Sequence, residues 1–73
     1  MMIRQQIGDA EGVALSKAQL GRLFESTGRL GEAETQVSDA LEIFTRIGNV
    51  PMQEKASRHL DRIRAKLKTN VVP

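Results

Sequence analysis

The sequence predicts an all-α fold: an antiparallel pair of helices followed by one further helix. Two observations support this prediction. Apolar residues recur at steps of three and four along segments 9–27, 30–47 and 51–68, which is the spacing of one face of a helix. Glycines stand between these segments at Gly28 and Gly48, and a glycine can take the left-handed conformation that closes a helix.

The chain of 73 residues is long enough for one small domain, residues 1–73. A domain of this size buries only about 60% of the surface that its unfolded chain exposes, so its own core is marginal. The chain contains no Cys, Trp or Tyr, so the core is mainly aliphatic and has no disulfide or thiolate metal site to strengthen it. We therefore expect another chain to add buried area.

Hydropathy and charge indicate a soluble, cytoplasmic protein with no membrane association. The N-terminal sequence MMIRQQIGDAEG lacks the apolar run of a signal peptide, and nowhere do 18 uncharged apolar residues follow one another. The net charge is +2, but residues 1–50 carry five Lys/Arg against seven Asp/Glu, whereas residues 51–73 carry six against two. This asymmetry is the stronger electrostatic signal.

The first predicted helix, 9–27, begins at Asp9, whose carboxylate can accept hydrogen bonds from the amides of the first turn. Gly21 costs about 1 kcal/mol in a helix relative to Ala, so packing rather than propensity should hold this segment. We expect Gly21 and Ala33 to lie at the closest approach of the first two helices. The residues predicted to pack at this contact are Leu20, Gly21, Phe24, Ala33, Val37, Ala40 and Leu41.

The second and third predicted helices differ in character. Segment 30–47 has a regular apolar face and an acidic, solvated opposite face. The turn at 48–51, with sequence GNVP, is typical of a helix end followed by a new helix start. Segment 51–68 has only a narrow apolar seam among charges, which is typical of a capping helix. Residues 69–73 are expected to be a frayed tail.

An internal repeat with an offset of forty residues relates the two ends of the chain. The pairs at this offset are Ile3 and Ile43, Ile7 and Ile47, Gly8 and Gly48, Asp9 and Asn49, Leu20 and Leu60, and Leu23 and Ile63. The offset is about the length of one helical-hairpin unit. It predicts that residues 1–8 are the tail of a preceding helix, residues 9–47 a full repeat and residues 48–68 a half repeat.

The order of residues in the first two helices resembles a tetratricopeptide repeat. The matching positions are the pair Leu20 and Gly21, then Phe24, the turn residue Gly28, then Ala33, and the pair Ala40 and Leu41. The match covers residues 7–47 well and residues 48–68 weakly. Its spacing is similar to the variety found in kinesin-light-chain-type adaptors and bacterial regulators. The resemblance implies an α-solenoid fragment that acts as a protein-binding scaffold.

Catalysis is not indicated by the sequence. No combination of nucleophile, base and carboxylate can be assembled, and the single histidine, His59, has no second His or Cys with which to share a metal ion. The sequence GRLGE at 28–32 is not a phosphate loop, because no strand precedes it and no G-K-[ST] follows. We therefore predict a protein that is not an enzyme and holds no metal or other cofactor.

A basic run along the third predicted helix is the strongest candidate for a binding surface. Arg58 and Arg62 are four residues apart and stack on one face. In tetratricopeptide proteins the first helices of successive repeats line a concave groove, and the resemblance implies that Arg22 and Glu25 face this groove together with Arg58 and Arg62. Some members hold a partner's terminal carboxylate there, but Ala18 stands where a Lys would serve, which argues against that clamp.

Three functions remain open from the sequence. The first is a protein-interaction module that binds a protein or peptide segment, in particular an acidic one, in the groove. The second is a self-association element that forms a homo-oligomer. The third is nucleic-acid binding through the basic helix 51–68, against which stand the acidic first half and the lack of aromatic residues that could stack on bases. The basic face can also serve only to solubilise the capping helix.

Overall fold

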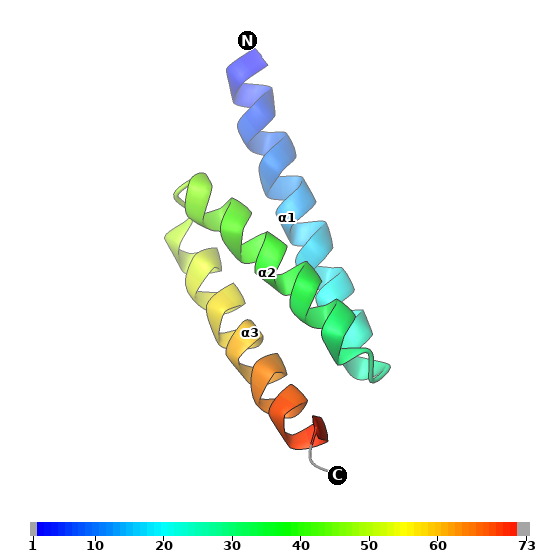
Figure 1. Ribbon diagram of the computed structural model, residues 1–73. Helices are drawn as coiled ribbons and strands as arrows, with labels where there is room; N and C mark the ends of the chain where they lie inside the picture. Colours follow the sequence, from blue (N-terminus) through cyan, green and yellow to red (C-terminus); the bar gives the residue numbers. More distant parts are fainter. Residues whose placement is uncertain (1, 72–73) are drawn as a thin grey trace.

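The computed structural model describes the backbone of residues 2–71 and the side chains of residues 8–69. Within this part of the chain it contains three α-helices and no strand: α1 (Met2–Ser26), α2 (Leu30–Arg46) and α3 (Val50–Val71). The prediction of an all-α fold is confirmed. Each helix runs antiparallel to the one before it, and both α1 and α3 pack against α2 (Figure 1).

The structure corrects the predicted helix bounds at five places. α1 ends one residue earlier than predicted, at Ser26, and α3 begins one residue earlier, at Val50. α1 begins at Met2 rather than at Asp9, so residues 2–8 continue the first helix instead of forming the tail of a preceding one. α2 ends at Arg46, one residue before the predicted end. α3 continues to Val71, so that residues 69–71 are helical and not a frayed tail, while residues 72–73 lie outside the described part.

The different surroundings of Gly8 and Gly48, which are paired by the forty-residue repeat, explain why α1 begins before Asp9. Gly48 has a positive φ of 75° and turns the chain, whereas Gly8 lies within α1. After Gly48 comes Pro51, which has no N–H to donate to the carbonyl four residues before it, so a helix cannot continue unbroken through it. The residue equivalent to Pro51 is Glu11, which keeps this donor and favours helix. The chain therefore turns at one glycine and not at the other.

The turns that join the helices share one hydrogen-bond pattern. Gly28, with φ of 83°, donates to the carbonyl of Glu25 at 3.2 Å, and Arg29 donates to the carbonyl of Phe24 at 2.8 Å. Two such bonds around a left-handed residue satisfy the carbonyls at the end of a helix. The turn at Gly48 repeats the pattern with donor–acceptor distances of 3.2 and 2.9 Å. Both glycines therefore have the turn role that the sequence predicts.

The core lies on the two sides of α2. Its members that are fully inaccessible to solvent are Ala14 from α1, Ala33, Val37, Ala40 and Phe44 from α2, and Ile63 from α3. Because α2 supplies most of them, it is the one helix that contacts apolar side chains on two flanks. α1 and α3 therefore pack on adjoining flanks of α2, close enough for Glu25 of α1 to contact side chains of α3.

Gly21 sets how closely α1 approaches α2. A Cβ atom added there would overlap Cγ2 of Val37 and lie 3.5 Å from the carbonyl oxygen of Ala33. Phe24 and Leu41, also predicted at this contact, are partly buried against the core. Leu20 is different: it is 42% exposed and is not among the residues packed against the core. Its predicted place in this contact is therefore wrong.

Two glycine substitutions test the close approach. Gly21→Ala puts a methyl group into the space of Val37 and is expected to lower the free energy of unfolding by about 1–3 kcal/mol. Gly12→Ala meets no atom within 4 Å, so it should raise that free energy by about 0.5–1 kcal/mol through helix propensity alone. Urea unfolding followed by circular dichroism measures both. Equal stabilisation by the two substitutions would show that α1 does not approach α2 at Gly21.

Candidate functional site

A groove of about 390 Å³ runs between α1 and α3, and we call it the α1–α3 groove. The residues that line it are Leu15, Ala18, Gln19 and Arg22 from α1, Phe44 from α2, and Met52, Lys55, Ala56, Arg58, His59 and Arg62 from α3. The groove exists because α1 and α3 both pack against α2 and pack little against each other. Arg22, Arg58 and Arg62, three of the predicted groove residues, are brought together here.

The middle of the groove is apolar. Phe44, fully inaccessible to solvent, closes it from below, and Met52 and Leu15 add partly exposed apolar surface from its two walls. Ala18 and Ala56 also line the groove, and their short side chains take up little of the space between the walls. A surface of this kind can take up apolar side chains of a partner.

Four cationic side chains surround this apolar surface, and none of the described residues that line it is acidic. Arg62 pairs with Glu25. Arg22, Lys55 and Arg58 lie farther than 4 Å from any carboxylate among residues 8–69. Like charges gathered along a groove with apolar walls raise the local potential and attract anionic groups.

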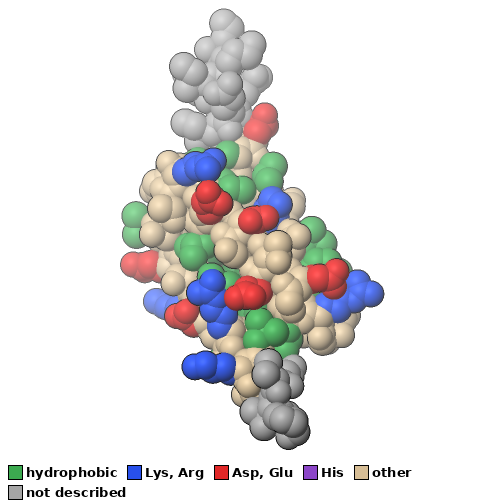
Figure 2. Space-filling model, in the orientation of Figure 1, with side chains coloured by type: hydrophobic (Ala, Val, Ile, Leu, Met, Phe, Trp, Pro, Cys, Tyr) green, Lys and Arg blue, Asp and Glu red, His purple; other side chains and the backbone are tan. Residues whose placement is uncertain are grey.

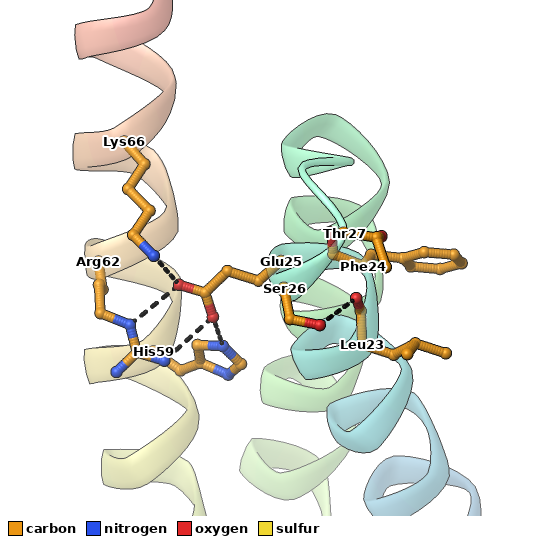
Figure 3. Close-up of polar contacts among 8 residues, drawn as sticks. All are labelled: Leu23, Phe24, Glu25, Ser26, Thr27, His59, Arg62 and Lys66. Carbon is orange, nitrogen blue, oxygen red and sulfur yellow. Dashed lines mark hydrogen bonds and ion pairs between the residues drawn. The ribbon is translucent and has the colours of Figure 1, made fainter.

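One largely buried carboxylate, that of Glu25, holds α1 to α3 at one end of the groove. We call Glu25, His59, Arg62 and Lys66 the Glu25 cluster (Figure 3). Arg62 donates to the carboxylate through Nε and Nη2, both at 3.1 Å, and Lys66 donates through Nζ at 2.7 Å. His59 Nε2 lies 2.8 Å from Oε1, and since a carboxylate only accepts, the imidazole donates. The Glu25 side chain is only 8% exposed.

The Glu25 cluster keeps its carboxylate ionised. The hydrogen bond from Arg62 does most to hold the pKa of Glu25 well below its usual value of 4.5; burial opposes this effect, and Lys66 and His59 add to it. Glu25 in turn raises the pKa of Arg62. Glu25 was predicted to face a partner in the groove. Its carboxylate instead binds three side chains of α3, so its role here is to join the two walls.

Sequence reasoning missed His59 and Lys66 as parts of the site. The sequence indicates His59 only as a candidate metal ligand, and Lys66 only as one of the six Lys/Arg residues of segment 51–73. The available signal was the spacing of His59, Arg62 and Lys66, which are three and four residues apart and so share one face of α3. The sequence does not reveal that Glu25 lies opposite this face, because their contact depends on how α1 and α3 are placed by α2.

The face that α2 presents has a different electrostatic character. Acidic and basic side chains are interspersed over it (Figure 2). Several are paired: Asp39 with Lys17 at 3.4 Å, Glu34 with Arg64 at 2.9 Å, and Glu42 with Arg46 at 3.0 Å. The charges on this face largely neutralise one another, whereas those of the α1–α3 groove are all positive.

Within the part of the chain that the structure describes, no three His, Asp or Glu side chains lie close enough together to hold a metal ion. The helices there also include none with the length and apolarity needed to span a bilayer. No family model, no curated protein and no solved structure matches the sequence or the fold of this chain.

Replacing Glu25 by Gln tests the cluster. The variant keeps the shape of the side chain but removes the charge that orders its three donors. We expect the free energy of unfolding at neutral pH to fall by about 1–3 kcal/mol, toward the lower end because Arg62 and Lys66 are half exposed and can be solvated again. Glu42→Gln is the matched control, since Glu42 is exposed and has a single partner, and it should change stability by less than about 0.5 kcal/mol.

The same pair of proteins gives a pH test. Folding lowers the pKa of Glu25, so its contribution to stability is complete above the unfolded value of 4.5 and is lost as the pH falls below it. The stability difference between the parent and Glu25→Gln should therefore shrink between about pH 5 and pH 3. A difference that stays constant over this range would show that the carboxylate is not held in its charged form by the cluster.

Proposed function

We propose that the chain is a non-catalytic protein-interaction module that binds an acidic segment with apolar side chains in the α1–α3 groove. One observation carries this proposal: an apolar floor is flanked by Arg22, Lys55 and Arg58, which have no carboxylate within 4 Å among the described side chains. Leu15 and Met52, the partly exposed apolar residues of the groove, offer surface for apolar side chains of a partner. The cations favour an acidic partner over a basic one and speed its approach.

The geometry of the groove supports a helical or extended peptide as the ligand. α1 and α3 run in the same direction and form its two walls (Figure 1). An amphipathic segment can lay its apolar side chains between such walls and leave its charged side chains at the rim. The Glu25 cluster ties the walls together at one end. A groove that is already formed costs less to fill than one that must be ordered on binding.

The resemblance to tetratricopeptide repeats is part of the proposal. In that family the first helices of neighbouring repeats line the groove that receives a partner, and the resemblance implies that α1 and α3 are the corresponding helices of this chain. The hairpin of α1 and α2 with α3 as a capping helix is compatible with an α-solenoid fragment. These parallels support a scaffold function.

Nucleic acid is the competing ligand class, and the arrangement of charges favours it less. Of the basic residues on α3, Arg62 and Lys66 bind Glu25, and Arg64 pairs with Glu34 at 2.9 Å. The aromatic residue at the groove, Phe44, is fully inaccessible to solvent and has no free face for stacking on a base. A polyanion would therefore gain charge contacts but no base contacts.

Charge reversal at the rim tests the proposal. The ligand is a fluorescein-labelled peptide of mixed Leu and Glu, compared with a matched peptide in which Lys replaces Glu, and binding is followed by fluorescence anisotropy. Arg22→Glu combined with Arg58→Glu should weaken binding of the acidic peptide by about tenfold to a hundredfold, equivalent to about 1.4–2.8 kcal/mol. Arg62 is left in place because it also holds Glu25.

Lys68→Glu is the control, since it changes an exposed cation of α3 that does not line the groove. It should weaken binding only slightly, and raising the salt concentration should weaken binding to the parent. Equal affinity of the parent for the Glu and Lys peptides would contradict the proposal. A single-stranded oligonucleotide that binds more tightly than the acidic peptide would favour the nucleic-acid alternative.

A further inference from the structure

One face of α1 is left without a neighbour in the described part of the chain. It consists of Val13, Ser16, Leu20 and Leu23, and we call it the α1 outer face. The exposed fractions of its three apolar residues are 47% for Val13, 42% for Leu20 and 55% for Leu23. Steps of three, four and three residues place all four on one side of the helix. In Figure 3 Leu23 extends away from α3, while Glu25 extends toward it.

The α1 outer face is also free of charge. The charged residues of α1 between Val13 and Leu23 point elsewhere: Lys17 pairs with Asp39 of α2 at 3.4 Å, and Arg22 lines the α1–α3 groove. Uncharged positions therefore follow one another for about three turns on this face. A surface helix normally carries charged residues on the face opposite the core, as α3 does.

The internal repeat shows what kind of surface this is. The residues forty positions after Ser16, Leu20 and Leu23 are Ala56, Leu60 and Ile63. On α3 these three are 6%, 5% and 0% exposed, because they form the face that packs on α2. These three repeat positions therefore form a helix-packing face on α3, whereas on α1 the equivalent positions are exposed.

We propose that a second copy of this chain covers the α1 outer face, so that two α1 helices pair antiparallel about a two-fold axis near residue 18. In this register Val13 lies opposite the Leu23 position of the second copy, and Ser16 lies opposite its Leu20 position. Each contact therefore sets a smaller side chain against a larger one, as close packing requires. The contact is isologous, so each copy contributes the same residues.

Charge at the ends of the face favours this orientation and this partner. Asp9 stands one turn before Val13, and Arg29, whose Nε also lies 3.7 Å from Oε1 of the exposed Glu32, is in the turn that follows α1, at the opposite end of the face. Antiparallel pairing brings Asp9 of each copy toward Arg29 of the other, whereas parallel pairing would place like charges together. The α1–α3 groove is on a different side of α1 and stays open, so this proposal is independent of the proposed function.

Sedimentation velocity over a series of protein concentrations tests the pairing. The contact is short, so we expect a dimer with a dissociation constant in the micromolar range. Leu23→Glu puts two like charges into the apolar contact and should raise that constant at least tenfold. Val50→Glu is the matched control, because Val50 is equally exposed, at 54%, but lies on α3. It should leave the constant unchanged. Circular dichroism confirms that each variant folds.

Disulfide trapping tests the orientation without relying on the Glu variant. The chain has no cysteine, so Asp9→Cys and Thr27→Cys each carry a single thiol. A mixture of these two variants should form a mixed disulfide much faster than Asp9→Cys alone, since only antiparallel copies bring positions 9 and 27 together. A parent that stays monomeric at all concentrations overturns the proposal. So does equal loss of the dimer in Leu23→Glu and Val50→Glu, or preferential disulfide formation by Asp9→Cys alone.

Discussion

The rest of the structure depends on the double packing of α2. Gly21 has no side chain, so the backbone of α1 comes into contact with Val37 of α2. The apolar seam of α3 packs on the other flank of α2. With no aromatic residue other than Phe24 and Phe44, close contact of backbones has to replace large side chains as the means of filling the core. Because both flanks of α2 are used, α1 and α3 lie next to each other with a groove between them.

Charge then divides the molecule into surfaces of different character. On the face of α2, acids and bases are near one another and pair. The Lys and Arg residues that line the groove between α1 and α3 have no acidic residue beside them in that lining, and the nearby Glu25 is held in the contact with His59, Arg62 and Lys66. A net charge of +2 therefore understates how positive the groove is. The surplus of cations is local, and it is this local surplus that a partner meets.

The sequence was sufficient for the helices and for the turns at Gly28 and Gly48, because both follow from local rules of spacing and backbone conformation. The repeat was misleading at Gly8. Three residues after Gly8 stands Glu11, whereas Pro51 stands three residues after Gly48, so the helix continues through Gly8. The sequence also placed Arg22, Arg58 and Arg62 near one another. It could not show that Leu20 faces outward or that Glu25 binds α3, since both depend on the angle at which α1 and α3 meet α2.

The most direct test of the central claim, that the α1–α3 groove is the binding surface, is a methyl-detected NMR titration with the mixed Leu and Glu peptide. The account predicts shift changes at the methyl groups of Leu15, Ala18, Met52 and Ala56, which line the groove, and none at Val50, which lies outside it. Changes confined to Val13, Leu20 and Leu23, or spread over the α2 face with the groove methyl groups unaffected, would contradict it.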